Sequence, residues 1–241
     1  MCEFCTQHGE GKKWYENMAN YTEAVFRQVN SEQQLRAFLS RFYRSLKVET
    51  ARAYKWKKRL PRLYQHLIYP RLTRHLKKTH FGQIIPLEDA EYILTRVDSI
   101  VRLPCICRRV TTGREQRFCL AVGLDLTDVL QEEPLFRDLE RLSAARAIAM
   151  VRRLDQAGMT HSIWTFNTPF IGALCNCDQN CMAYRAQHTM NISRTMWKGE
   201  MVAAINARLC SGCRECLKRC YYGAIRHHPR DHRCEIVPDR C

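Results

Sequence analysis

Residues 210–220 read Cys210-Ser-Gly-Cys213-Arg-Glu-Cys216-Leu-Lys-Arg-Cys220. The four cysteines have the C-x2-C-x2-C-x3-C spacing of a [4Fe–4S] ligand loop. Gaps of two residues let the chain turn around three corners of a cubane, and Gly212 lets the backbone approach the inorganic sulfides. The sequence therefore predicts that Cys210, Cys213, Cys216 and Cys220 are the first-choice metal ligands.

The flanks of this loop carry a family resemblance. Val202–Ile205 stands where a first strand is expected, Gly223-Ala-Ile225 follows the fourth cysteine, and Cys234–Cys241 is typical of a return strand. From Val202 to Cys241 the chain resembles the bacterial two-cluster [4Fe–4S] ferredoxins. The resemblance implies a ferredoxin-like half module, one or more [4Fe–4S] clusters and one-electron transfer to or from a partner.

Two positions depart from the family pattern. Tyr221 stands where the family usually has proline, and Cys241 is both the last residue and the first cysteine of an anticipated second loop. In this family the fourth cysteine of each loop ligates the opposite cluster, which assigns Cys220 and Cys241 to a second cluster. Three explanations stay open: a longer chain, which we favour, rearrangement of Cys220 or another thiol, or ligands from a partner. A zinc site of four thiolates is the alternative for the whole loop, and the flanking resemblance argues against it.

A second group of cysteines lies in the middle of the chain. C-x-C pairs are too short for an easy internal disulfide, and in a reducing compartment clustered thiols are typical of metal ligands. The sequence predicts a second metal site, with Arg108 and Arg109 lowering thiolate pKa values and Cys119 as a core thiol. Its ligands are Cys105, Cys107, Cys175, Cys177 and Cys181. Reduced buried cysteines or a transient disulfide are the alternatives. Cys2, Cys5 and His8 form a weaker candidate group, for zinc or for the middle cluster.

The composition of the chain indicates the kind of compartment in which these sites would form. The 241 residues include 14 cysteines, no apolar run of the kind a secretory signal needs and none long enough for a membrane span. These features favour a cytoplasmic, reducing setting. The middle cysteine region resembles the segment that precedes ferredoxin modules in some proteins of anaerobes, and this resemblance implies an anaerobic setting.

Positive charge is concentrated in residues 41–78, which hold 13 Lys and Arg against Glu49, whereas the whole chain has a net charge of +15. This basic region predicts a docking face for an anionic partner, first an acidic redox protein. An anionic membrane surface is a second option. Nucleic acid is a weaker one, although Tyr54, Trp56, Tyr64 and Tyr69 would suit base stacking in a zinc-stabilised nucleic-acid-binding protein. An iron–sulfur subunit of a redox enzyme is a further alternative, for which no substrate can be identified.

The fold class predicted is α+β, in three regions: a helical, basic region at 1–85, a cysteine-rich α+β region at 86–198, and an incomplete ferredoxin-type module at 199–241. Within them, Ser31 and Gln34 predict a capping box, and Pro70 predicts a helix break. We expect a β-hairpin over 100–124 with its turn at Thr111–Gly113, a helix from about 134 to 158, and strands at 160–166 and 201–205.

Overall fold

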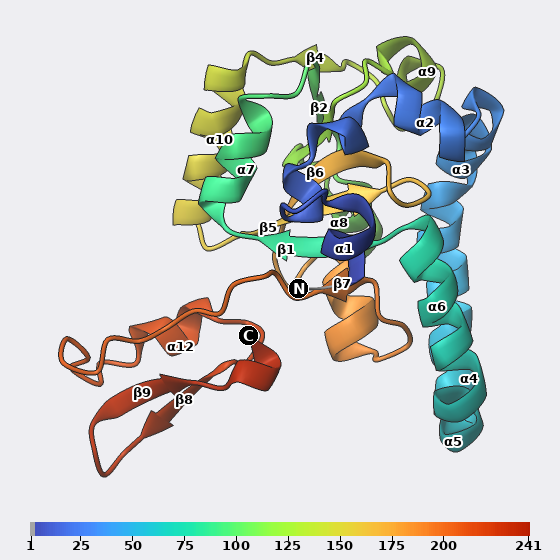
Figure 1. The fold of residues 1–241 in the computed structure, drawn as a ribbon. Helices are drawn as coiled ribbons and strands as arrows, with labels where there is room; N and C mark the ends of the chain where they lie inside the picture. The colour runs from blue at the N-terminus through green and yellow to red at the C-terminus, as the bar shows by residue number, and fades with distance from the viewer. Residues whose placement is uncertain (1–2) are drawn as a thin grey trace. The chain divides into compact units, whose positions relative to one another are not determined.

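The computed structural model describes residues 3–241, and its fold is α+β, as the sequence predicts. The chain divides after Trp197 into an N-terminal unit and a C-terminal unit, Lys198–Cys241, which are described separately. A seven-stranded sheet forms the centre of the N-terminal unit, and helices cover both of its faces (Figure 1).

The strands of this sheet are antiparallel neighbours except at one edge, where the last pair is parallel. Their order is β4-β2-β3-β6-β5-β1-β7. The strands are β1 (Gly82–Ile85), β2 (Ile100–Leu103), β3 (Cys119–Val122), β4 (Glu140–Arg141), β5 (Thr160–Thr165), β6 (Ile171–Cys177) and β7 (Met196–Trp197).

Strand alternation separates two hydrophobic cores. Leu120 and Val122 of β3 pack with α7 (Leu87–Leu94) and α10 (Ala144–Gln156) on one face. Ala121, between them, belongs to a second core, formed on the opposite face with the helices α2 (Glu23–Val29), α3 (Glu32–Arg44) and α9 (Thr127–Gln131). Apart from the helical hairpin described next, the other short helices of this unit are α1 (Glu3–His8), η1 (Trp14–Glu16), η2 (Met18–Tyr21), α8 (Ile106–Thr112), α11 (Met182–Tyr184) and η5 (Arg185–Thr189).

A helical hairpin stands beside the sheet. Its first leg runs through α3, η3 (Ser45–Glu49) and α4 (Thr50–Arg59), and its second leg runs through α5 (Pro61–Leu63), η4 (Tyr64–Ile68) and α6 (Tyr69–Thr79). The chain reverses at Leu60, where the backbone leaves the helical region at φ −134° and ψ 67°. Figure 1 shows α5 at the end of this hairpin that lies farthest from the sheet.

Two predictions about the hairpin have opposite outcomes. The capping box is confirmed: the Ser31 side chain accepts from the Gln34 N–H, and the Gln34 side chain accepts from the Ser31 N–H. The break at Pro70 is wrong. Pro70 lies in the first turn of α6, directly after the π-helical turn η4, where a proline without an N–H is tolerated.

Three other local predictions need correction. β2 and β3 form the expected antiparallel pair, but α8 lies between them, and Gly113 ends that helix in the left-handed conformation at φ 71°. The helix predicted from 134 begins only at Ala144, because Ser143 caps it, and the earlier Leu135 and Leu139 pack against the second core. Residues 201–205 form no strand, since no neighbouring strand pairs with them.

The C-terminal unit is small and sparsely packed. It contains α12 (Glu215–Arg219), the antiparallel strands β8 (Ile225–His228) and β9 (Arg233–Ile236), and η6 (Pro238–Arg240). Ala224 and Cys234 are the two buried residues between Lys198 and Cys241. Across residues 3–241, no helix combines the length and the apolar character needed to cross a membrane.

Candidate metal centres

Six cysteines from separate segments meet on one face of the sheet of the N-terminal unit. Cys175 and Cys177 are two residues apart on β6, so both side chains project to the same face. Cys119 begins the neighbouring strand β3, Cys105 and Cys107 stand at the start of α8, and Cys181 precedes α11. All six line a single cavity.

The sulfur atoms in this group interact with one another. The Sγ atoms of Cys105 and Cys119 are 3.3 Å apart, and the Phe118 N–H donates to the Cys105 Sγ at 3.0 Å. The thiols of Cys177 and Cys181 are also hydrogen-bonded. No disulfide is present among residues 3–241. The group is therefore a set of reduced thiols in mutual contact, which Cys119, predicted to be a core thiol, joins.

Arg108 provides a positive charge beside these sulfurs. Its side chain is 3% exposed, and it donates to the Asp178 carboxylate at 3.0 Å. The hydrogen bond from Cys177, and then the charge of Arg108, lower the pKa of Cys181. The Arg108 Nε is buried and has no hydrogen-bond partner in the described part of the chain. The site therefore holds a cation with unused donor capacity next to its thiols, which suits a thiolate-bound centre of net negative charge.

Burial acts in the other direction on the remaining thiols. It raises the pKa of Cys107 to about 12, and the hydrogen bond with Cys119, followed by burial, raises the pKa of Cys105. These thiols are protonated at neutral pH, so binding of a metal ion would displace their protons.

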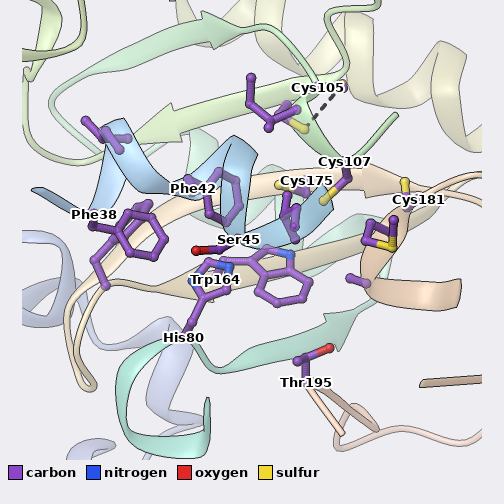
Figure 2. A pocket seen from close by; sticks show the side chains of 18 of the residues that line it. Phe38, Phe42, Ser45, His80, Cys105, Cys107, Trp164, Cys175, Cys181 and Thr195 are labelled. Carbon is purple, nitrogen blue, oxygen red and sulfur yellow. Dashed lines mark hydrogen bonds between the residues drawn. The ribbon is translucent and has the colours of Figure 1, made fainter. Parts of the chain in front are cut away.

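The cavity beside the thiols has a volume of about 300 Å³. Figure 2 shows Cys105, Cys107, Cys175 and Cys181 gathered on one side of it, and aromatic side chains with His80 across from them. The His80 ring lies 4.9 Å from Trp164 and 5.5 Å from Phe38, centroid to centroid. Its Nδ1 donates to the Thr165 carbonyl at 3.0 Å, and burial lowers its pKa to about 4, so the ring is neutral.

The chemistry of this donor set fits an iron–sulfur cluster. Six thiols include the four that a cubane requires, and Arg108 offsets charge. Among residues 3–241, no group of three or more Cys, His, Asp or Glu side chains is already arranged around a common metal position. The fit therefore rests on the donors, which are of the right kind and sufficient in number.

In the C-terminal unit, Cys210 lies beside Cys234, a residue that sequence analysis did not assign as a ligand. The Cys234 N–H donates to the Cys210 Sγ at 3.3 Å. This bond, together with the Gly212 N–H, lowers the pKa of Cys210. The Cys234 side chain is buried, and burial followed by its hydrogen bond with Cys216 raises its pKa to about 11. Cys234 of β9 therefore lies against two thiols of the loop, those of Cys210 and Cys216.

The other predicted ligands of this unit are more open. Cys213 is exposed, while Cys216, in the first turn of α12, and Cys220, directly after that helix, are half-buried. The Cys241 Sγ accepts the Ala203 N–H at 3.4 Å. Arg214, inside the loop, has a positive φ of 65°, so the backbone here turns in the left-handed region.

The described members of the N-terminal candidate group, Cys5 and His8, differ in their surroundings. Cys5 is buried in the first hydrophobic core, and burial lowers the pKa of the half-buried His8. Cys2 lies outside the described residues. Cys5 is therefore a packed core thiol, and it does not line the cavity of the middle group.

Cys234 escaped sequence analysis because its role depends on strand register. It stands opposite His227 in the β8–β9 pair, 24 residues after Cys210. The sequence signal available was a cysteine in the return strand of the ferredoxin-like segment.

No family model, curated protein or solved structure matches this chain.

Proposed function

We propose that the protein is an iron–sulfur electron-transfer protein. The observation that carries the proposal is the make-up of the C-terminal unit: of residues 198–241, two are buried and six are cysteines. A unit this small, without a hydrophobic core, requires cross-links or a metal to fold. The described cysteines form no disulfide, which leaves metal ligation as the stabilising interaction.

A [4Fe–4S] cluster would supply one-electron oxidation and reduction. Cys210, Cys213 and Cys216 would hold it, with Cys234 as the nearest further thiol. Backbone N–H groups that donate to the sulfurs, such as that of Cys234 on Cys210, raise the reduction potential by stabilising negative charge.

The six-thiol group of the N-terminal unit supports a second centre. Its donors exceed the four that one cubane requires, and Arg108 stands beside them as a buried counter-charge. The buried strand β6 would hold this centre rigidly in a medium of low dielectric constant.

Anaerobic purification tests the proposal. We expect a broad absorbance near ~400 nm, iron and acid-labile sulfide in similar amounts, and an electron paramagnetic resonance signal after reduction with dithionite. Zinc without sulfide would refute the proposal and support a zinc-stabilised protein.

Variants then assign the ligands. Cys213→Ser is expected to lower the iron and sulfide of the C-terminal unit, and Cys234→Ser to lower them to a similar extent. The double variant Cys107→Ser/Cys181→Ser should remove those of the N-terminal unit. Cys5→Ala is the control, because it removes a buried thiol outside both groups. Wild-type iron content in Cys213→Ser would show that the loop binds no cluster.

The cavity favours one alternative function, an iron–sulfur subunit of a redox enzyme. Thr195 lines the cavity, and its Oγ1 is buried without a hydrogen-bond partner in the part of the chain described. A few polar groups in a mostly apolar chamber with aromatic side chains are typical of a small-molecule site. The probe is 1-naphthol, which we expect to shift the resonance spectrum of the reduced protein but not of Thr195→Val. Identical spectra with and without the probe would exclude this alternative.

A further inference from the structure

We infer that the end of the helical hairpin is a docking surface for an anionic phospholipid membrane. Its apolar tip, defined here as Trp56, Leu60, Leu63 and Leu67, enters the lipid interface, and the surrounding Lys and Arg side chains bind the headgroups.

The first observation is the exposure of the apolar tip. Trp56 is 52% exposed, Leu60 42%, Leu63 45% and Leu67 46%. Isolated exposed leucines are ordinary on protein surfaces, but these four side chains lie within twelve residues around the reversal at Leu60. A cluster of this kind marks an interaction site.

The second observation is the charge around the tip. Eleven of the thirteen Lys and Arg side chains of residues 41–78 are exposed. Within residues 3–241, Lys77 is the one member of this set in an ion pair, with Glu3. Glu49, in η3, is the one acidic residue of the region and lines a surface pocket with Trp56, so thirteen basic side chains stand against a single carboxylate. The positive charge is therefore not neutralised by the protein and is available to an anionic surface.

The third observation is how the hairpin is supported. Tyr64 is buried and donates to the Ile192 carbonyl at 2.9 Å, and the Lys57 ammonium donates to the Met190 carbonyl at 2.7 Å. The four apolar side chains of the tip stay exposed although these two neighbours are held by the rest of the unit, and Figure 1 shows α5 at the far end of the hairpin. The hairpin is thus fixed on the unit with its apolar tip exposed.

These three features favour lipid over an acidic protein. Binding of an acidic protein requires only exposed cations. Trp and Leu flanked by Lys and Arg are instead the composition of helices that lie in a membrane interface. Tryptophan prefers the level of the headgroups, and each basic residue near an anionic surface contributes about 1 kcal/mol. The lipid surface uses both kinds of side chain at the same end of the hairpin.

Co-sedimentation of the full chain with vesicles tests the inference. We expect binding to phosphatidylcholine vesicles that contain phosphatidylglycerol, weakening as salt is raised, and little binding to pure phosphatidylcholine. The triple variant Leu60→Gln/Leu63→Gln/Leu67→Gln should lower the partition coefficient by at least about tenfold. These positions are exposed, so the variant should retain the wild-type melting temperature.

A matched control uses the C-terminal unit. Met201, Val202 and Leu209 are 51%, 57% and 82% exposed, and their triple replacement by Gln should leave vesicle binding unchanged. A second readout is quenching of tryptophan fluorescence by brominated lipid, which Trp56→Phe should largely remove.

Three results would overturn the inference. One is the absence of binding to anionic vesicles, and another is equal binding by wild type and the tip variant, since charge alone would then suffice. The third is a wild-type dimer that the tip variant dissociates while neither protein binds vesicles, because the apolar tip would then contact a second copy of the chain.

Discussion

Arg108 is the single residue on which the six-thiol group most depends for charge balance. It is buried, it pairs with Asp178 at 3.0 Å, and it lowers the pKa of Cys181 together with the Cys177 hydrogen bond. Removing Arg108 leaves the Asp178 carboxylate, which is 23% exposed, without its partner, and this is costlier than losing a pair that is exposed on both sides.

We expect Arg108→Leu to lower the free energy of unfolding by about 3 kcal/mol and to reduce iron retention. Arg146→Leu is the matched control, because Arg146 is 66% exposed and pairs with Glu140 at the surface; its cost should stay below about 1 kcal/mol. Chemical denaturation measures both. Equal costs for the two variants would contradict the role assigned to Arg108.

His80 predicts a pH dependence of stability. Burial lowers its pKa from the ordinary 6.5 to about 4 in the folded protein, so between these pH values the unfolded chain binds the additional proton. Stability contributed by the neutral ring is complete above about pH 6.5 and is lost as pH falls towards 4, by up to about 3 kcal/mol.

His80→Phe removes this titration, and its stability should therefore decline less than that of wild type between pH 6.5 and 4. Urea denaturation at a series of pH values gives both curves. Parallel curves over that range would show that His80 titrates normally in the folded protein.

At the scale of elements, α3 shows how local sequence builds the first leg of the hairpin. The reciprocal hydrogen bonds of Ser31 and Gln34 satisfy two N–H groups of the first turn. The leg continues through η3 and α4 to the apolar tip, and Leu35 and Leu39 anchor it to the second core.

Ser31→Ala is expected to destabilise the N-terminal unit by about 1 kcal/mol, because the N-cap hydrogen bond is lost. Ser40→Ala, on the same helix, is the control: Ser40 is exposed, its hydroxyl bonds within the helix, and alanine favours helix, so the change should stay within about 0.5 kcal/mol. Thermal unfolding followed by circular dichroism compares them. A Ser31→Ala protein as stable as Ser40→Ala would show that the capping box contributes little.

At the scale of the whole molecule, the two units differ in what holds them together. The N-terminal unit has two hydrophobic cores on either side of a seven-stranded sheet. The C-terminal unit buries Ala224 and Cys234. Metal ligation should therefore be a minor part of the stability of the first unit and most of the stability of the second.

Hydrogen exchange after removal of iron tests this difference. The amides of β8 and β9 are expected to lose nearly all protection, whereas those of α10 and β5 remain protected, because their burial does not depend on metal. The iron-loaded protein is the control. Equal protection of β8 and β9 with and without iron would show that the C-terminal unit folds without a cluster.

Much of the fold could be predicted from local patterns. Helical periodicity and the capping box identified α3, alternation identified β5, and the α+β class followed from their sequence order. The errors arose where a local signal had two structural solutions. Pro70 suits a helix start as well as a helix break, and Leu135 and Leu139 fit a helical stripe although they pack outside any helix against the second core.

The sequence by itself determined the candidate groups of this protein: the C-x2-C-x2-C-x3-C loop, the C-x-C pairs and the basic region at 41–78 are all set by spacing along the chain. Tertiary structure alone decided which residues meet. Sheet register brings Cys119 to Cys105 and Cys234 to Cys210, packing buries Arg108, and the hairpin leaves its apolar tip exposed. These contacts join residues far apart in sequence, and local periodicity carries no information about such pairings.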